Sequence, residues 1–413
     1  MTTKPNPLSA QAMANATEEP ARFGSGQSVR RLEDDALLMG AGQFTSDVNA
    51  ADQAIIFFLR SPYPHARIVS IDCTEARAMP GVLQIVTGAD LVAAGVKPIP
   101  GSTFKRLDRL PCAAPDRRAL AHERVRFVGE AVVAVVALSL QQARDAAEAV
   151  MVDYEELPMV VNLSDAMAPD APRLSDAAPD NLAGETRYGN VQATADAFAG
   201  AAHVVTLDVI NQRLSPLSLE PRTVLALPDA GTGRLTIRMS TQMPSGVRNS
   251  VCDALGLEKA EVRVIVGDVG GGFGMKTGIY PEDIALAFCA RALQRPLKWV
   301  SDRSEEFISA SHGRDIETRA EMALDASGKI LALRLATLAN VGAYATGTGV
   351  TIQVLIGPWV QTSVYDIQLI DFHFIGVMTN TSCTGAYRGA GRPEAIYNME
   401  RLMDEAARQS GID

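Results

Sequence analysis

The stretch Val262-Arg-Val-Ile-Val-Gly-Asp-Val-Gly-Gly-Gly-Phe-Gly-Met-Lys-Thr277 decides both the expected fold and the expected site. Val262, Val264 and Val266 alternate with Arg263 and Ile265, which predicts a mostly buried strand. A run of three glycines begins four residues later, and a further glycine follows after Phe273. Glycine loses much backbone entropy on folding. Such a run therefore indicates backbone that takes positive φ angles or lies very close to another group.

The glycine run by itself leaves three interpretations open. It is a tight structural turn, a phosphate-binding loop, or a loop whose bare amides face a cofactor other than a simple nucleotide. A P-loop ends in Gly-Lys-Thr, whereas Met275 separates Gly274 from Lys276 here. The stretch also lacks the G-x-G-x-x-G spacing. The spacing therefore disfavours a nucleotide-binding protein, which remains an alternative hypothesis.

The flanks of this loop predict alternating strands and helices. Pro281 followed by two acidic residues is expected to open a helix, because proline and negative charge suit a first turn. Pro296 ends that helix, and 297–300 returns as a strand. Upstream, a helix is expected to begin at Asp90 as its capping residue, and another is expected to be capped by Ser139. Strand-like runs lie before, between and after these helices, at 54–59, 67–71, 82–86, 131–138 and 365–374.

These elements predict an α/β (α+β) fold with two main domains. A stretch rich in Ser, Asp, Ala and Pro separates them and is typical of a linker. The expected organisation is a mobile tail at 1–28, a first domain at 29–160, a linker at 161–184 and a second domain at 185–413.

Composition excludes several classes of function. The chain has 413 residues, a net charge of -10 and a pI of about 5.2, which disfavours nucleic-acid binding. No apolar run is long enough to span a bilayer, and a cytoplasmic location is expected. The five cysteines are scattered without a C-x-x-C motif, which argues against an iron–sulfur cluster or zinc held by this chain. The five histidines are dispersed as well.

A second glycine loop, Ala386-Tyr-Arg-Gly-Ala-Gly-Arg392, runs into another helix that proline opens. Arg388 and Arg392 lie close to the expected start of that helix. Positive charge at a helix N-terminus favours an anion. Solvated surface charge is the equally open alternative.

These motifs occur in an order that resembles the molybdopterin-binding large subunit of the xanthine oxidase family of molybdenum hydroxylases. The resemblance runs from about Arg30 to the end of the chain. It rests on many short segments: Arg31-Leu-Glu-Asp34, Met39-Gly-Ala-Gly-Gln-Phe-Thr-Ser-Asp47, Leu59-Arg-Ser-Pro-Tyr-Pro-His-Ala-Arg-Ile68, Val125-Arg-Phe-Val-Gly-Glu130, Val152-Asp-Tyr-Glu-Glu-Leu-Pro158, Leu219-Glu-Pro-Arg222, Ser240-Thr-Gln242 and both glycine loops.

The resemblance implies a fold, a cofactor and the residues that hold it. The expected fold is an a/b hammerhead domain followed by the first molybdopterin-binding domain. The expected cofactor is molybdenum held by molybdopterin, as the cytosine dinucleotide, with no side-chain ligand to the metal. By matching position, Gln242 would hydrogen-bond an oxo ligand of the molybdenum, and Arg388 would contact the cofactor through its backbone. Phe273 and the amides of its glycine neighbours would line the metal, namely Gly271, Gly272 and Gly274.

Several positions depart from particular members of the family. Thr277 and Ala390 stand at substrate-pocket positions where xanthine oxidases carry glutamate and phenylalanine, so purine recognition is disfavoured. Gly389 stands where carbon monoxide dehydrogenases carry a cysteine, which disfavours carbon monoxide oxidation. No glutamate matches the motif of the family's general base, so that base is expected outside this chain.

The implied function is that of a molybdenum hydroxylase subunit. It would hydroxylate an N-heteroaromatic or aldehyde carbon with water-derived oxygen. Electrons would leave through partner subunits that carry [2Fe-2S] clusters and FAD. We expect either a fragment or a split subunit, completed by a second molybdopterin-binding chain or C-terminal half. The alternatives are a scaffolding subunit whose partner supplies the catalytic base, and an enzyme similar to aldehyde or carbon monoxide dehydrogenase.

Overall fold

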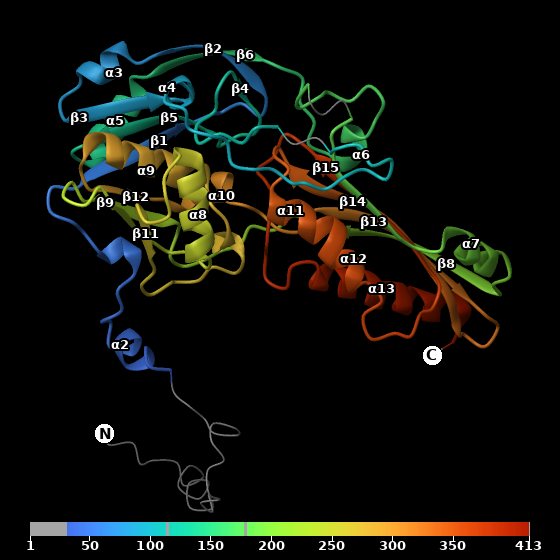
Figure 1. Ribbon diagram of the computed structural model, residues 1–413. Helices are drawn as coiled ribbons and strands as arrows, with labels where there is room; N and C mark the ends of the chain where they lie inside the picture. Colours follow the sequence, from blue (N-terminus) through green and yellow to red (C-terminus); the bar gives the residue numbers. More distant parts are fainter. Residues whose placement is uncertain (1–30, 113–114, 177–179, 413) are drawn as a thin grey trace, which may run out of the picture. The chain divides into compact units, whose positions relative to one another are not determined.

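The computed structural model describes residues 31–112, 115–176 and 180–412, and its backbone is drawn in Figure 1. The expected mobile tail at 1–28 lies outside the described residues. The chain divides into two compact units, Met1–Gln43 and Phe44–Asp413. Among the described residues of the first unit, helix α2 (Asp34–Leu38) buries none of its side chains. All the sheets belong to the second unit.

A seven-stranded sheet in the second unit carries strands from both expected domains. β1 lies between β12, with which it pairs in parallel, and β5, with which it pairs antiparallel. Residues 29–160 and 185–413 therefore share one sheet. In spatial order the strands are β11 (Val262–Ile265), β10 (Leu235–Met239), β9 (Thr223–Pro228), β12 (Leu297–Val300), β1 (Ala54–Arg60), β5 (Ala131–Ala137) and β3 (Val82–Thr87).

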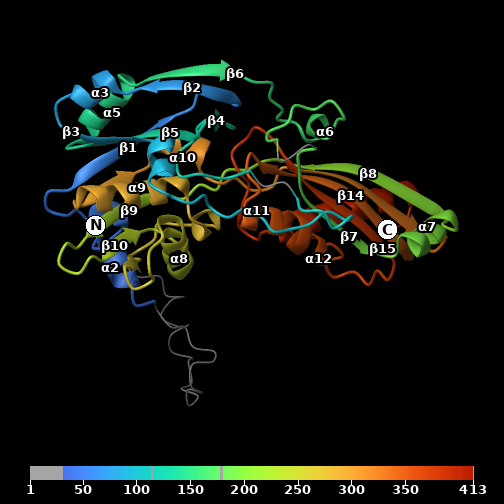
Figure 2. The same ribbon diagram turned by 45° about the horizontal axis from the view of Figure 1, so that its top comes forward.

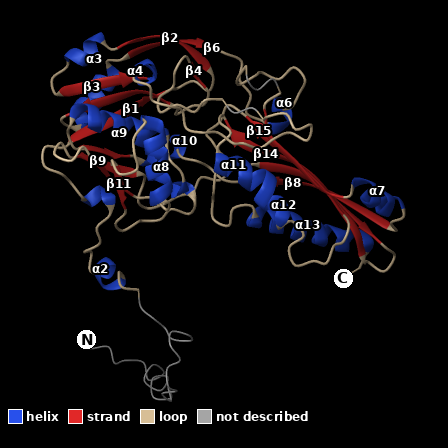
Figure 3. Ribbon diagram, viewed as in Figure 1, coloured by secondary structure: helices blue, strands red, loops and turns tan. Residues whose placement is uncertain are grey.

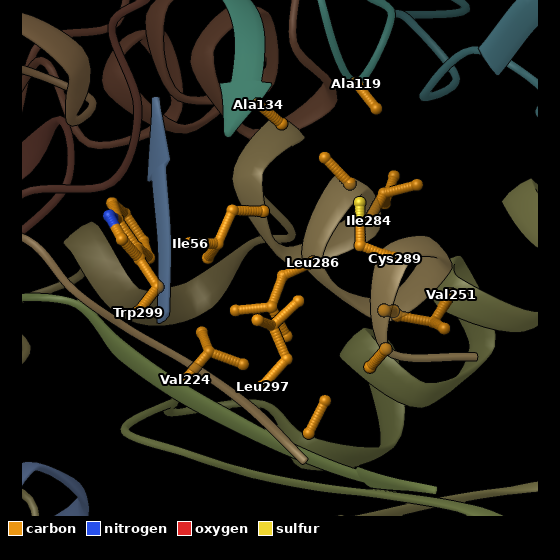
Figure 4. Close-up of a cluster of buried hydrophobic side chains, with 14 of the residues drawn as sticks. Ile56, Ala119, Ala134, Val224, Val251, Ile284, Leu286, Cys289, Leu297 and Trp299 are labelled. Carbon is orange, nitrogen blue, oxygen red and sulfur yellow. The ribbon is translucent and has the colours of Figure 1, made fainter. Parts of the chain in front are cut away.

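Helices cover both faces of this sheet. α8 (Pro244–Leu255) and α9 (Pro281–Leu293) pack on one face, and α3 (Thr74–Ala78) and α5 (Leu140–Glu148) pack on the other. Every residue of β5 is buried, because its alternating side chains meet helices on both sides. Figure 4 shows the first of these cores, in which Ile56, Val224 and Leu297 from the strands lie beside Leu286 of α9.

A smaller sheet lies in the first expected domain. Its strand order is β4 (Arg124–Val125), β2 (Ala66–Asp72), β6 (Met151–Glu156), and β2 and β6 run side by side in Figure 2.

One expected helix start is wrong. α4 (Gly88–Ala93) is capped by Thr87 rather than begun by Asp90. The Thr87 hydroxyl accepts from the Asp90 amide at 3.3 Å, and the Asp90 carboxylate accepts from the Thr87 amide at 2.8 Å. Asp90 is thus the third residue of a capping box. The expected linker also contains a short helix, α6 (Leu163–Ala166).

A five-stranded sheet forms the rest of the second expected domain. Its strand order is β7 (Leu182–Gly189), β15 (Ile370–Met378), β14 (Ile330–Gly342), β13 (Ile316–Leu324), β8 (His203–Asn211). α13 (Arg392–Ser410) runs along one face, as Figure 3 shows. α7 (Val191–Ala199) covers part of the other, where Phe198 lies 4.3 Å from the Arg334 guanidinium. The strand expected at 365–374 begins later, at β15, because the chain forms a turn at 361–364 and has no regular secondary structure at 366–369.

The remaining elements are short and connect the sheets. Within the described residues no helix is both long enough and apolar enough to cross a membrane. The short elements are η1 (Thr45–Asp47), η2 (Met275–Thr277), α10 (Arg303–Ser309), α11 (Gly347–Thr351), η3 (Ile352–Ile356) and α12 (Gly357–Trp359).

A buried charge network ties α9 and α10 to the seven-stranded sheet. Arg222, directly before β9, is 4% exposed and pairs with Glu306 at 3.0 Å and with Glu282 at 3.4 Å. Arg60, from β1, pairs with Glu282 at 2.8 Å. Burial alone would raise the pKa of Glu282, but the two arginines outweigh it and hold that pKa at about 2.

We expect Arg222→Met to be strongly destabilising. The long apolar side chain keeps most of the volume, but Glu282 and Glu306 lose a buried positive partner. The free energy of unfolding should fall by about 3–5 kcal/mol in urea titrations. Arg67→Met is the control, because it breaks an exposed pair with Glu155 at 3.1 Å and should cost about 0–1 kcal/mol. Equal losses in the two variants would refute the structural role of Arg222.

Candidate active site

The glycine loop follows β11 and passes close to the segments that carry Gln242 and Ala386. A Cβ on Gly272 would lie 2.5 Å from Oε1 of Gln242. Gly274 has a φ of +96°, and a Cβ there would lie 2.5 Å from the carbonyl oxygen of Ala386. Only glycine fits both places without displacement. Phe273, between them, has a φ of 50° and a side chain that is 43% exposed.

Gln242 is fixed against this loop at both its backbone and its side chain. It follows β10 and directly precedes the turn that leads into α8. Its amide donates to the carbonyl of Lys276 at 2.8 Å, and its Oε1 accepts from the amide of Gly274 at 2.9 Å. Gln242 is nevertheless exposed. With Oε1 engaged, the two hydrogens on the side-chain nitrogen are available as donors at the loop surface.

A buried ion pair between Lys276 and Glu220 fixes the glycine loop to the rest of the fold. Lys276 Nζ donates to the Glu220 carbonyl at 2.8 Å and lies 3.2 Å from its Oε2. The same carboxylate accepts from the Gly270 amide at 2.9 Å and from the Thr45 amide at 3.3 Å. Burial lowers the pKa of Lys276, and the charge of Glu220 opposes that shift. Sequence reasoning noted Glu220 only as part of a motif and missed this role.

The second glycine loop is joined to the first. The Arg388 amide donates to the Phe273 carbonyl at 2.8 Å, and the Arg388 guanidinium lies 6.0 Å from the Phe273 ring centre. Arg314 sets this loop: it donates to the carbonyls of Tyr387 and Arg388, both at 2.9 Å, and pairs with Glu394 at 3.0 Å. Sequence reasoning missed Arg314, because no motif marks it.

The two expected substrate-pocket residues lie in different places. Thr277 lines a pocket of about 230 Å³ next to the glycine loop, whereas Ala390 does not line it. Ala390 lies in the turn before α13 with a φ of 39°. The pocket wall mixes apolar and hydroxyl side chains with one arginine, among them Ile99, Arg117, Tyr280, Ser311, Tyr344 and Thr384.

Tyr280 links this pocket to the buried charges. Its hydroxyl donates to the Met275 carbonyl at 2.8 Å, and its ring lies 4.1 Å from the Arg222 guanidinium. Its amide donates to the Asp283 carboxylate at 2.9 Å in the first turn of α9. Burial raises the pKa of Asp283 to about 7.

The structure therefore brings Gln242, the glycine loop with Phe273, and Arg388 together on one exposed surface. Among the described residues, no group of three or more His, Cys, Asp and Glu side chains could hold a metal ion. The described cysteines form no disulfide. What the surface offers is a set of backbone amides, one carboxamide and an aromatic ring.

Comparison with known proteins places this arrangement in a family. A model described as a molybdopterin cofactor-binding domain matches residues 174–413, and one described as the aldehyde oxidase and xanthine dehydrogenase a/b hammerhead domain matches residues 39–158. The chain belongs to the xanthine oxidase family of molybdenum hydroxylases. The expected resemblance and the expected fold class, an a/b hammerhead domain followed by a molybdopterin-binding domain, are confirmed.

Individual members of this family match the present chain over nearly its whole length. The chain is 32% identical to the gamma subunit of the 6-hydroxypseudooxynicotine dehydrogenase complex of Paenarthrobacter nicotinovorans, covering 97% of this chain and 50% of that subunit. It is 30% identical to the nicotinate dehydrogenase large molybdopterin subunit of Eubacterium barkeri, covering 91% of this chain and 84% of that subunit. The crystal structure of quinoline 2-oxidoreductase from Pseudomonas putida 86 superposes with a TM-score of 0.87 at 35% identity, covering 94% of this chain and 49% of that one. The chain thus spans about half the length of the first and third of these relatives.

We expect Gly272→Ala to displace Gln242 without unfolding the chain. The added methyl group would meet the end of a flexible side chain, 2.5 Å from Oε1, so the side chain moves rather than the backbone. The hydrogen bond from the Gly274 amide to Oε1 of Gln242 should be lost. A shift of the Gly274 amide resonance in NMR spectra would report this loss. Gly278→Ala is the control, because open space surrounds Gly278 and its φ is -117°. An unchanged Gly274 resonance in Gly272→Ala would count against this packing.

Asp283 should make stability depend on pH. Its folded pKa of about 7 lies above the ordinary value of 3.8, so its contribution is fully present below about pH 4 and is lost as pH rises through 7. Asp283→Asn keeps an acceptor for the Tyr280 amide but cannot ionise. We expect its free energy of unfolding to fall less than that of the wild type between pH 4 and 8. Asp404→Asn, at an exposed site on α13, should follow the wild type. Parallel curves for all three proteins would contradict the assignment.

Proposed function

We propose that this chain is the cofactor-holding part of a molybdenum hydroxylase that acts on an N-heteroaromatic or aldehyde carbon. The observation that carries the proposal is the convergence of Gln242, Phe273 and Arg388 on one surface, built on the fold that quinoline 2-oxidoreductase shares. When bound, a molybdenum–molybdopterin group supplies the redox chemistry that these side chains lack.

The residues of the loop fit such a group. A Cβ at Gly272 would fill the space beside Gln242, so the loop presents bare backbone there. The side-chain nitrogen of Gln242 can donate to an oxygen of the cofactor, and Phe273 can cover one side of it. Gln242 would thus orient the cofactor, and the second glycine loop, which the hydrogen bond from the Arg388 amide to the Phe273 carbonyl fixes beside the first, would contact it at Arg388.

The general base is proposed to come from outside the described residues. Glu220 pairs with Lys276, Glu394 pairs with Arg314, and neither carboxylate lines the pocket beside Thr277. Their side chains are 5% exposed. Neither is placed to take a proton from a substrate in the pocket.

The pocket beside Thr277 is the proposed substrate site. Among the described residues of its wall there is no Asp or Glu, and most of its hydroxyl groups already have partners within the fold. It suits a small ring or an aldehyde better than a substrate that needs many polar contacts. Gly389, in place of a cysteine, favours carbon hydroxylation over carbon monoxide oxidation.

The partners and the cofactor form follow from the same proposal. We infer a cytosine dinucleotide form of the pterin, and electron transfer to partner subunits with [2Fe-2S] clusters and FAD. A second molybdopterin-binding segment, within the same chain or on a partner, completes the cofactor site. The coverage of about half of quinoline 2-oxidoreductase supports this inference.

Purification from the native host with partners, followed by molybdenum analysis and turnover assays, tests the proposal. Gln242→Ala should keep its molybdenum content but lose about 10²-fold in kcat, because one donor to a reacting centre is removed. Gln409→Ala, on α13, is the control and should leave both unchanged. A molybdenum-free complex would refute the proposal. Full turnover in Gln242→Ala would instead assign the chemistry to a partner and leave this chain as a scaffold.

A further inference from the structure

A hollow at the edge of the seven-stranded sheet collects positive charge. It lies between the edge strand β11 and the first turn of α8, and its volume is about 420 Å³. Its wall includes Pro244 and Ser245 of α8 and four cationic side chains, and none of the described Asp or Glu residues lines it. The cations of this basic hollow are Arg234, Arg248, Lys259 and Arg263.

These charges have no carboxylate partners in the described structure. The chain carries 48 acidic and 38 basic residues, so acceptors for ion pairs are abundant overall. None of the four cations nevertheless forms an ion pair with a described residue. The neighbouring Glu261 is engaged elsewhere: its carboxylate accepts from the Glu258 amide at 2.8 Å and lies 3.8 Å from Arg291. No described carboxylate therefore forms a direct ion pair with a cation of the hollow.

Arg248 distinguishes the hollow from an ordinary basic surface. Its side chain is half-buried, and its Nε is buried without a hydrogen-bond partner among the described residues. Its other end donates to Oδ1 of Asn249 at 3.3 Å. A buried donor left unpaired costs about 1–3 kcal/mol, so an acceptor that enters the hollow would recover part of that cost.

The N-terminus of α8 adds to the positive electrostatic potential of the hollow. This helix is 12 residues long, begins with Pro244, and has no side-chain cap from Met243. The first amides of an uncapped helix are free donors, and the helix dipole places partial positive charge there. Arginine side chains and a helix N-terminus together match the geometry and charge of phosphate oxygens.

We propose that the basic hollow binds a small phosphorylated anion through a diphosphate group. A diphosphate matches a hollow that has cations on several sides better than a single phosphate does. Arg248 and the first turn of α8 would hold one phosphate, and Lys259 and Arg263 at the rim would hold the other. The phosphate end of a bound cofactor and a free phosphorylated metabolite share this chemistry.

Inorganic pyrophosphate, titrated calorimetrically into the full chain at low ionic strength, tests the site. We expect saturable one-to-one binding that added salt weakens. Arg248→Gln should raise the Kd at least about tenfold, the loss of one hydrogen bond to a charged group. The double variant Lys259→Gln/Arg263→Gln alters exposed residues only, so it should fold normally and also bind weakly. Arg401→Gln, exposed on α13, should bind like the wild type.

The same titration on the assembled, cofactor-loaded complex separates the two sources. Loss of pyrophosphate binding in the loaded complex would place the cofactor's own phosphates in the hollow, whereas retained binding would indicate a free metabolite. The proposal is overturned if the cofactor-free chain shows no saturable binding, or if Arg401→Gln weakens it as much as Arg248→Gln. It is also overturned if pyrophosphate fails to bind and the hollow variants instead lose a co-purifying chain, which would indicate contact with an acidic protein surface.

Discussion

One short segment, 220–222, holds both the fold and the site through two buried charges. Glu220 accepts from the glycine loop and from Lys276, while Arg222 binds the carboxylates of α9 and α10. Removing a charged group from water is expensive, and only a complete set of partners repays it. The loop is therefore fixed by buried charges that would each be left unpaired if one partner were replaced, although the outer surface of the loop is exposed.

Because these buried charges hold the loop rigidly, its exposed part can keep an unfavourable backbone conformation. Phe273 takes a left-handed conformation, which costs energy for a residue with a side chain. The Arg388 amide on its carbonyl and the carboxamide of Gln242 on the next amide hold it there. The surface proposed to receive the cofactor is thus shaped before any cofactor arrives, which reduces the ordering that binding must supply.

Local structure in this chain is largely predictable from sequence, and the long-range arrangement is not. β11 and α9 follow from valine alternation and a first-turn proline, and motif positions locate Gln242 and both glycine loops. Asp90 was misassigned because Thr87, three residues earlier, is the better cap. Arg314 was missed because its role depends on carbonyl groups of a loop distant in sequence, and no local pattern encodes such a contact. Similarly, nothing in 54–60 reveals that it pairs with 297–300.

The parallel pairing of β1 with β12 has a consequence for recombination among relatives. Ala54 and Ile55 lie beside Leu297 and Lys298, so the two matched family segments meet inside a single sheet rather than at a linker. A chimaera that exchanges residues 39–158 alone would place side chains from two different proteins on either side of the β1–β12 pairing, in the middle of that sheet. The two segments therefore fold around one shared sheet, and a boundary placed between them would divide a single core.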